Sequence, residues 1–104
     1  MREICLVHLD KTRPALVVTR VAARVAMTKV TVAPITATIR GLSSEVLVGP
    51  DNGLDHDCVV ALDNVLSVPV NLLGRTVGYL DADQETQLAR AMVLAYDLDI
   101  PLLE

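Results

Sequence analysis

The pattern of apolar and polar positions predicts a series of short strands followed by one long helix. Residues 3–9 are almost all apolar, and residues 29–36 alternate between apolar and polar, as in buried and half-buried strands. Pro34 within the second of these predicts a bulge or a sheet edge, because proline has no N–H to donate. Shorter apolar runs bounded by turn residues predict further strands, at residues 13–19, 45–48, 58–62, 65–68 and 76–80.

The closing helix is expected over residues 81–98. Asp81 is an N-cap candidate, and Gln84 three residues later completes a capping-box pair. Pro101 would stop any continuation. One apolar face is predicted, formed by Leu88, Ala91, Met92, Ala95 and Leu98.

Two shorter segments are also compatible with helix. Residues 20–27 favour one or two turns within a long excursion between strands, and residues 69–72 favour a single turn. The order of elements indicates one domain over residues 1–104, mainly β with a C-terminal helix. We expect a small, strongly curved antiparallel sheet or barrel that the helix closes on one side.

The apolar content adds an expectation of self-association. Hydrophobic residues make up 52% of the chain and the mean hydropathy is +0.45. A domain of this size buries only about 60–70% of its unfolded surface, so an apolar excess favours pairing with another chain. No run approaches the roughly 18–20 apolar residues of a membrane span, and no signal peptide opens the chain. Cys5 and Cys58 are expected to be free, packed thiols in a reducing cytoplasm.

Charge is divided unevenly along the chain, whose net charge is −4. Residues 1–40 hold seven basic and two acidic side chains, whereas residues 41–104 hold two basic and eleven acidic ones. A basic first part is compatible with binding a polyanion, because the local field matters more than the total. Charged side chains that only solvate loops would give the same distribution, so the charge pattern alone does not decide whether the chain binds a polyanion.

The histidines, the segment of residues 55–58 and the tyrosines are weaker candidates for a functional site. His8 lies in a predicted strand and His56 in a turn, so neither is favoured as a catalytic base. The sequence Asp55-His56-Asp57-Cys58 contains metal-ligand types, but a stretched chain divides them between two faces, and no metal site is predicted. Tyr79 and Tyr96 are the only aromatic residues, so base stacking is not expected to hold a nucleic acid.

Four segments in order resemble the MazF/PemK family of toxin endoribonucleases. They are Lys11-Thr12-Arg13-Pro14-Ala15-Leu16-Val17-Val18, Val32-Ala33-Pro34-Ile35-Thr36, the stretch from Gly53 to Val65, and Leu73-Gly74-Arg75-Thr76-Val77-Gly78-Tyr79-Leu80. The resemblance spans about residues 3–98. Cys58 and Asn64 stand where the family commonly has serine and glutamine, and the connector before Lys11 is shorter than usual.

The resemblance implies an SH3-like barrel of the CcdB/MazF/PemK type, a cytoplasmic homodimer, and the toxin role in a type II toxin–antitoxin pair. The implied activity is sequence-specific cleavage of single-stranded RNA without metal or cofactor. The implied partner is a cognate antitoxin with a flexible acidic segment. Arg13 and Thr36 are carried over as catalytic residues, and the candidate RNA contacts are Lys11, Thr12, Thr38 and Arg40.

Two other functions are compatible with the same barrel. A non-nuclease toxin, such as a CcdB-type gyrase poison, would act through the end of the C-terminal helix and would not need Arg13 or Thr36. An inactive binding module is the third possibility. Cleavage of RNA in the presence of EDTA would separate the nuclease from both alternatives.

Overall fold

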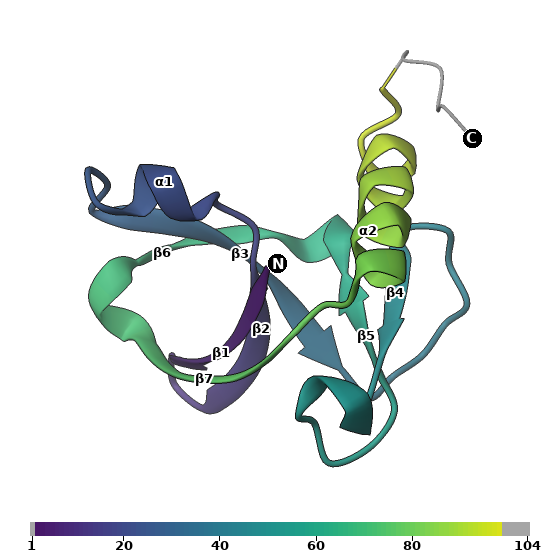
Figure 1. The fold of residues 1–104 in the computed structure, drawn as a ribbon, viewed down its shortest axis with the longest axis horizontal. Coiled ribbons are helices and arrows are strands. Elements are labelled where there is room, and N and C mark those ends of the chain that lie inside the picture. The colour runs from purple at the N-terminus through teal and green to yellow at the C-terminus, as the bar shows by residue number, and fades with distance from the viewer. Residues whose placement is uncertain (1, 99–104) are drawn as a thin grey trace.

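Seven strands form one curled antiparallel sheet, and a C-terminal helix packs beside β4 at one end of the sheet (Figure 1). The computed structural model describes residues 2–98. The strand order is β4-β5-β3-β2-β1-β7, with β6 pairing β3 off this path. The elements are β1 Glu3–His8, β2 Thr12–Val17, α1 Val21–Arg24, β3 Lys29–Thr36, β4 Glu45–Val48, η1 Pro50–Asn52, β5 Cys58–Ala61, η2 Leu62–Asn64, β6 Leu66–Pro69, η3 Val70–Leu72, β7 Leu73–Tyr79 and α2 Ala82–Ala95.

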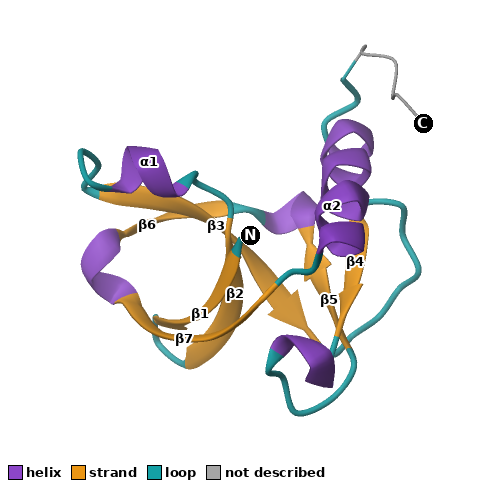
Figure 2. Cartoon of the chain, in the orientation of Figure 1, coloured by secondary structure: helices purple, strands orange, loops and turns teal. Residues whose placement is uncertain are grey.

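Strand β3 joins the parts of the sheet because it pairs with three strands. One edge pairs with β2, from Val17 opposite Val32 to Ala15 opposite Pro34. The other edge pairs with β6 up to Val32 and with β5 from Ile35 onward. Pro34 therefore lies where β3 changes partner, where a missing N–H costs no ladder hydrogen bond on that edge. The sheet bends away at this point into two parts, as Figure 2 shows.

The two faces of the sheet carry separate apolar cores, as the alternation of side chains along a strand requires. The larger core lies on the side of the sheet that faces α2 and includes Leu16 on β2, Val60 on β5 and Leu88 on α2. The smaller core fills the curl of β1, β2, β3 and β6 and includes Val17 and Val32. Cys5 and Cys58 are buried free thiols, one in each core, as predicted.

Helix α2 starts as predicted. The Asp81 side chain accepts a hydrogen bond from the Gln84 N–H at 2.8 Å, and the Gln84 side chain accepts from the Asp81 N–H at 3.0 Å. Buried Asn52 ties this helix start to η1, since its amide nitrogen donates to Gln84 Oε1 at 2.7 Å and to the Tyr79 carbonyl at 2.9 Å. The start of α2 is thus fixed against the sheet by side-chain hydrogen bonds as well as by apolar packing.

The end of α2 was predicted wrongly. The helix ends at Ala95, three residues before the predicted Leu98, and Asp97 adopts a left-handed conformation with φ of 52°. Leu98 therefore leaves the apolar face and is exposed, whereas Leu88 and Ala91 are buried and Met92 and Ala95 pack against the core. The predicted stop at Pro101 lies outside the described residues.

Most other elements agree with the sequence pattern within a few residues. The short helix α1 and the turn η3 are both present. Strand β7 begins three residues earlier than predicted, because Leu73 pairs with Val7 on β1 and Gly74 leaves room for the His8 ring. None of the helices in the described part of the chain is long and apolar enough to cross a bilayer.

A half-buried ion pair fastens α1 to the sheet. The Glu3 carboxylate on β1 accepts hydrogen bonds from the Arg24 guanidinium on α1, and from the Thr76 hydroxyl on β7 at 2.6 Å. The bonds from Thr76 and Arg24 lower the pKa of Glu3 from 4.5 to about 2. The ionised form of Glu3 is therefore stabilised by folding.

This shift predicts acid-sensitive stability. Because the unfolded chain holds the Glu3 proton more tightly than the folded chain, the stabilisation is complete above about pH 5 and is lost as the pH falls toward about 2. We expect Glu3→Gln to lower the free energy of unfolding at neutral pH by up to about 3 kcal/mol. Urea unfolding between about pH 7 and pH 3 should show this difference shrinking with acid. The control Asp51→Asn, at an exposed position of η1, should show no such trend.

Candidate functional site

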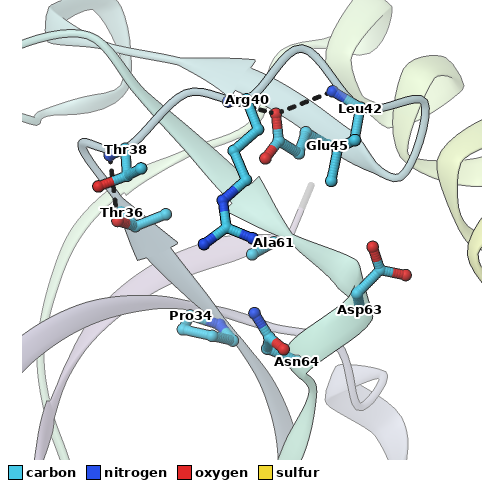
Figure 3. Close-up of a pocket in the computed structure, with 9 residues that line it drawn as sticks. All are labelled: Pro34, Thr36, Thr38, Arg40, Leu42, Glu45, Ala61, Asp63 and Asn64. Atoms are coloured by element: carbon cyan, nitrogen blue, oxygen red, sulfur yellow. Dashed lines mark hydrogen bonds between the residues drawn. The ribbon is translucent and has the colours of Figure 1, made fainter.

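A pocket of about 300 Å³ opens at the end of β3, over the face that carries Pro34 and Thr36. Its other walls come from the loop between β3 and β4 and from the turn η2, as Figure 3 shows. The lining residues are Pro34, Thr36, Thr38, Arg40, Leu42, Glu45, Ala61, Asp63 and Asn64. The pocket therefore collects three residues predicted from the sequence, namely Thr36, Thr38 and Arg40.

Thr36 is held in a small turn at the strand end. Its Oγ1 accepts a hydrogen bond from the Thr38 N–H at 3.1 Å, which fixes the hydroxyl beside the loop (Figure 3). A hydroxyl that accepts through a lone pair still has its own proton to donate. The proton of the Thr36 hydroxyl thus remains available to donate to a ligand in the pocket.

Arg40 extends from the exposed loop across the pocket, toward Pro34 and Asn64 (Figure 3). Its backbone N–H and those of the next two residues all point at the Glu45 carboxylate. A guanidinium in this position offers a planar set of donors to phosphate or to base edges.

The opposite wall carries Asp63 and Asn64 on η2, both exposed. Asp63 accepts a hydrogen bond from the hydroxyl of buried Ser44. Acidic and amide side chains accept from and donate to base edges. The pocket therefore combines a cation, a hydroxyl donor and groups suited to reading a base.

Arg13 is exposed on β2 and is not among the residues that line this pocket. The last β2–β3 pair toward the hairpin is Ala15 with Pro34, and Arg13 and Thr36 each lie two residues beyond it on their strands. Arg13 and Thr36 then share the face that carries Ala15 and Pro34. The two residues thus lie on neighbouring strands, and their joint role stays a prediction.

Lys11 and Thr12 lie on the β1–β2 hairpin rather than in the pocket. Both are exposed, and the Thr12 hydroxyl bonds to His8 Nδ1 at 3.0 Å. Since side chains alternate, Thr12 points to the opposite face from Arg13. Of the predicted RNA contacts, Thr38 and Arg40 are gathered at the pocket and Lys11 and Thr12 are not.

The basic first part of the chain is only partly available to a ligand. Arg2 pairs with Glu85, and Arg24 pairs with Glu3. The other basic side chains of residues 1–40 are exposed, namely Lys11, Arg13, Arg20, Lys29 and Arg40. Local pairing thus concentrates the remaining positive charge on β2, β3 and the two loops beside them.

A second pocket, of about 230 Å³, lies on the other side of β1 and β2 and includes His56, Cys58 and Arg75. Burial raises the pKa of the Cys58 thiol, and the charges of Asp57 and Asp55 raise it further. This cysteine is therefore not activated as a nucleophile. Within residues 2–98, no three His, Cys, Asp or Glu side chains are grouped so as to hold a metal ion.

Comparison with known proteins identifies the family. Residues 2–95 match the family described as PemK-like, MazF-like toxin of type II toxin-antitoxin system. The chain belongs to this toxin family. It is 52% identical over 99 residues to the endoribonuclease MazF3 of Mycobacterium tuberculosis, and the match covers 95% of this chain and 96% of that protein.

Solved structures of MazF-like toxins share the fold. The Mycobacterium tuberculosis toxin MazF-mt6 superimposes with a TM-score of 0.91 at 52% identity, covering 95% of this chain and all of that one. An endoribonuclease in complex with its cognate antitoxin, from mycobacterial species, gives a TM-score of 0.83 at 22% identity over 95% of both chains. The prediction of a curved antiparallel sheet with a C-terminal helix is confirmed.

Several residues at this pocket were not predicted from the sequence. Asp63 and Asn64 stand in one of the resembling segments, so their place there was an available signal. Glu45 and Ser44 gave no such signal, because their role depends on how the loop folds back over β5 and η2.

Proposed function

We propose that this MazF-like chain is the toxin of a type II toxin–antitoxin pair and cleaves single-stranded RNA. The pocket carries the proposal, because it brings the Thr36 hydroxyl and the Arg40 guanidinium together at the end of β3. The support from similarity is the 52% identity with a protein named as an endoribonuclease. The same name favours a nuclease over a gyrase poison or an inactive module.

The proposed reaction uses the 2′-hydroxyl of the RNA as nucleophile. The 2′-oxygen attacks the adjacent phosphorus, its proton leaves to a base or to water, and the bond to the 5′-oxygen breaks. The 5′-oxygen takes up a proton, and the other product ends in a 2′,3′-cyclic phosphate. A protein accelerates this step by aligning the atoms and by stabilising the extra negative charge on phosphorus.

Arg13 and Thr36 are proposed to supply that stabilisation. The fork of the Arg13 guanidinium suits two phosphoryl oxygens, and the oriented Thr36 hydroxyl donates to a third. Arginine stays charged at physiological pH, so charge stabilisation is assigned to it and proton transfer to another group or to water. Thr38 and Arg40 then contact the RNA from the pocket loop, and Lys11 and Thr12 contact it from the hairpin.

The proposed partners follow from the same surface. An antitoxin with a flexible acidic segment would compete with RNA for the exposed basic side chains of β2 and β3, because both are polyanions. The mycobacterial relative solved with its cognate antitoxin supports such a partner. We place the toxin in the cytoplasm, where its RNA substrate and the reducing conditions that keep Cys5 and Cys58 as thiols are found.

Cleavage in EDTA tests the function directly. The pure protein should cut single-stranded RNA with excess chelator present, because the reaction proposed needs only the RNA hydroxyl and side-chain donors. The products should carry a cyclic phosphate and a free 5′-hydroxyl. Cleavage that stops in EDTA and returns with added Mg²⁺ would contradict the proposed reaction.

The shape of the arginine side chain provides a second test. If Arg13 grips two phosphoryl oxygens in the transition state, Arg13→Lys should lose nearly as much rate as Arg13→Ala, about 100- to 1000-fold. RNA affinity should fall far less, since binding is spread over many phosphate contacts. Thr36→Ala should show the same pattern more mildly. Single-turnover cleavage and a binding titration measure both quantities, and a fully active Arg13→Lys would exclude the two-oxygen grip.

Assembly gives the third test. Large apolar side chains are exposed on separate elements, including Leu47 on β4 and Leu94 on α2, as expected for a chain that pairs with a second copy. Light scattering at micromolar concentration should therefore give about twice the 11.2 kDa chain mass. A monomer that cuts RNA at the full rate would contradict the proposed dimer.

A further inference from the structure

The carboxylate of Glu45 is bound by three successive backbone amides of the pocket loop. Its Oε1 accepts from the Arg40 N–H at 3.2 Å, the Gly41 N–H at 2.9 Å and the Leu42 N–H at 3.2 Å. Gly41 has φ of +75°, the left-handed conformation that lets neighbouring N–H groups converge on one anion. Glu45 also closes the loop through its own N–H, which donates to the Leu42 carbonyl at 3.1 Å.

An acid is unexpected in a pocket that is proposed to hold RNA. A free carboxylate would repel the phosphate backbone, and its removal would then strengthen binding. Here the three amide dipoles point at the negative charge and offset it locally. The structure therefore suggests that Glu45 serves the loop rather than the ligand.

The loop depends on this carboxylate because few other side chains anchor it. Residues 37–43 are all exposed, and Ser44 is the first buried residue before β4. Thr36 holds the Thr38 N–H at one end, and Ser44 bonds to Asp63 at the other. Glu45 holds the middle of the loop at Arg40, whose guanidinium crosses the pocket (Figure 3).

We propose that Glu45 is a positioning residue that fixes Arg40 for RNA binding by clamping the amides of residues 40–42. This inference rests on the proposed function. Without the carboxylate, the loop gains conformational freedom that must be lost again when RNA binds. Glu45 thus contributes to RNA affinity through Arg40 although its own charge opposes a polyanion.

The sign of the change in affinity separates this role from simple repulsion. Glu45→Ala should weaken RNA binding and raise KM about tenfold, similar to Arg40→Ala, with kcat changed much less. Glu45→Gln keeps an oxygen that can accept the same amides, so it should bind RNA more tightly than Glu45→Ala. If the charge acts only by repulsion, both variants should instead bind RNA more tightly than the wild-type chain. Asp83→Asn, at an exposed position of α2, removes one acid outside the pocket and is the matched control.

A double-mutant cycle tests whether Glu45 acts through Arg40. In an Arg40→Ala background, adding Glu45→Ala should cost less than about twofold further in RNA affinity, because the group it positions is already absent. Full additivity of the two losses would overturn the proposal. Thermal melting of each variant shows whether the fold is retained.

Amide hydrogen exchange gives a readout that needs no RNA. The amides of residues 40–42 should exchange faster in Glu45→Ala than in the wild-type chain, while β3 and β5 stay protected. Unchanged exchange, or RNA binding that is unchanged or tighter in Glu45→Ala, overturns this inference alone. A folded wild-type chain that neither binds nor cuts RNA overturns the proposed function, and the positioning role with it.

Discussion

Strand β3 must satisfy partners on both edges, and on one edge it exchanges β6 for β5 at Pro34. A proline at this step has no N–H to lose from a ladder, so the exchange leaves no buried donor unpaired. The sheet curls around this point, with one core on each face. The last residue of the strand, Thr36, lies just past the exchange, so the geometry that builds the fold also sets the floor of the pocket.

The pocket walls depend on backbone amides and short polar side chains more than on apolar packing. Thr36, Glu45 and Ser44 each hold one part of the loop through hydrogen bonds. The Ser44 hydroxyl does so by donating to Asp63. Such contacts specify a conformation without burying much apolar surface. A loop of this kind is precise enough to present a guanidinium and still open to a long, flexible substrate.

The sequence predicted the elements with strong local signals and missed those set by distant contacts. The start of α2 followed from Asp81 and Gln84, whose bonds are local. Its end did not follow, because the apolar pattern continued to Leu98 while the backbone turned at Asp97. Thr36 could be proposed from a motif segment and Arg40 as a nearby base, whereas the clamp by Glu45 required the fold of the loop. Arg13 lies outside the pocket and stays a prediction.

The turn formed by Asn52 and Gly53 affects how readily this chain is chemically degraded. Asparagine followed by glycine is the pair whose side chain most readily cyclises onto the next backbone nitrogen, which ends in deamidation. Here the Asn52 amide is buried, its nitrogen donates to Tyr79 and Gln84, and the Gly53 N–H donates to the Pro50 carbonyl at 3.0 Å. Cyclisation would first have to break these bonds, so Asn52 deamidates only as often as this turn opens. The hydrogen bond from Asn52 to Gln84 that fixes the start of α2 thereby also protects Asn52 from deamidation.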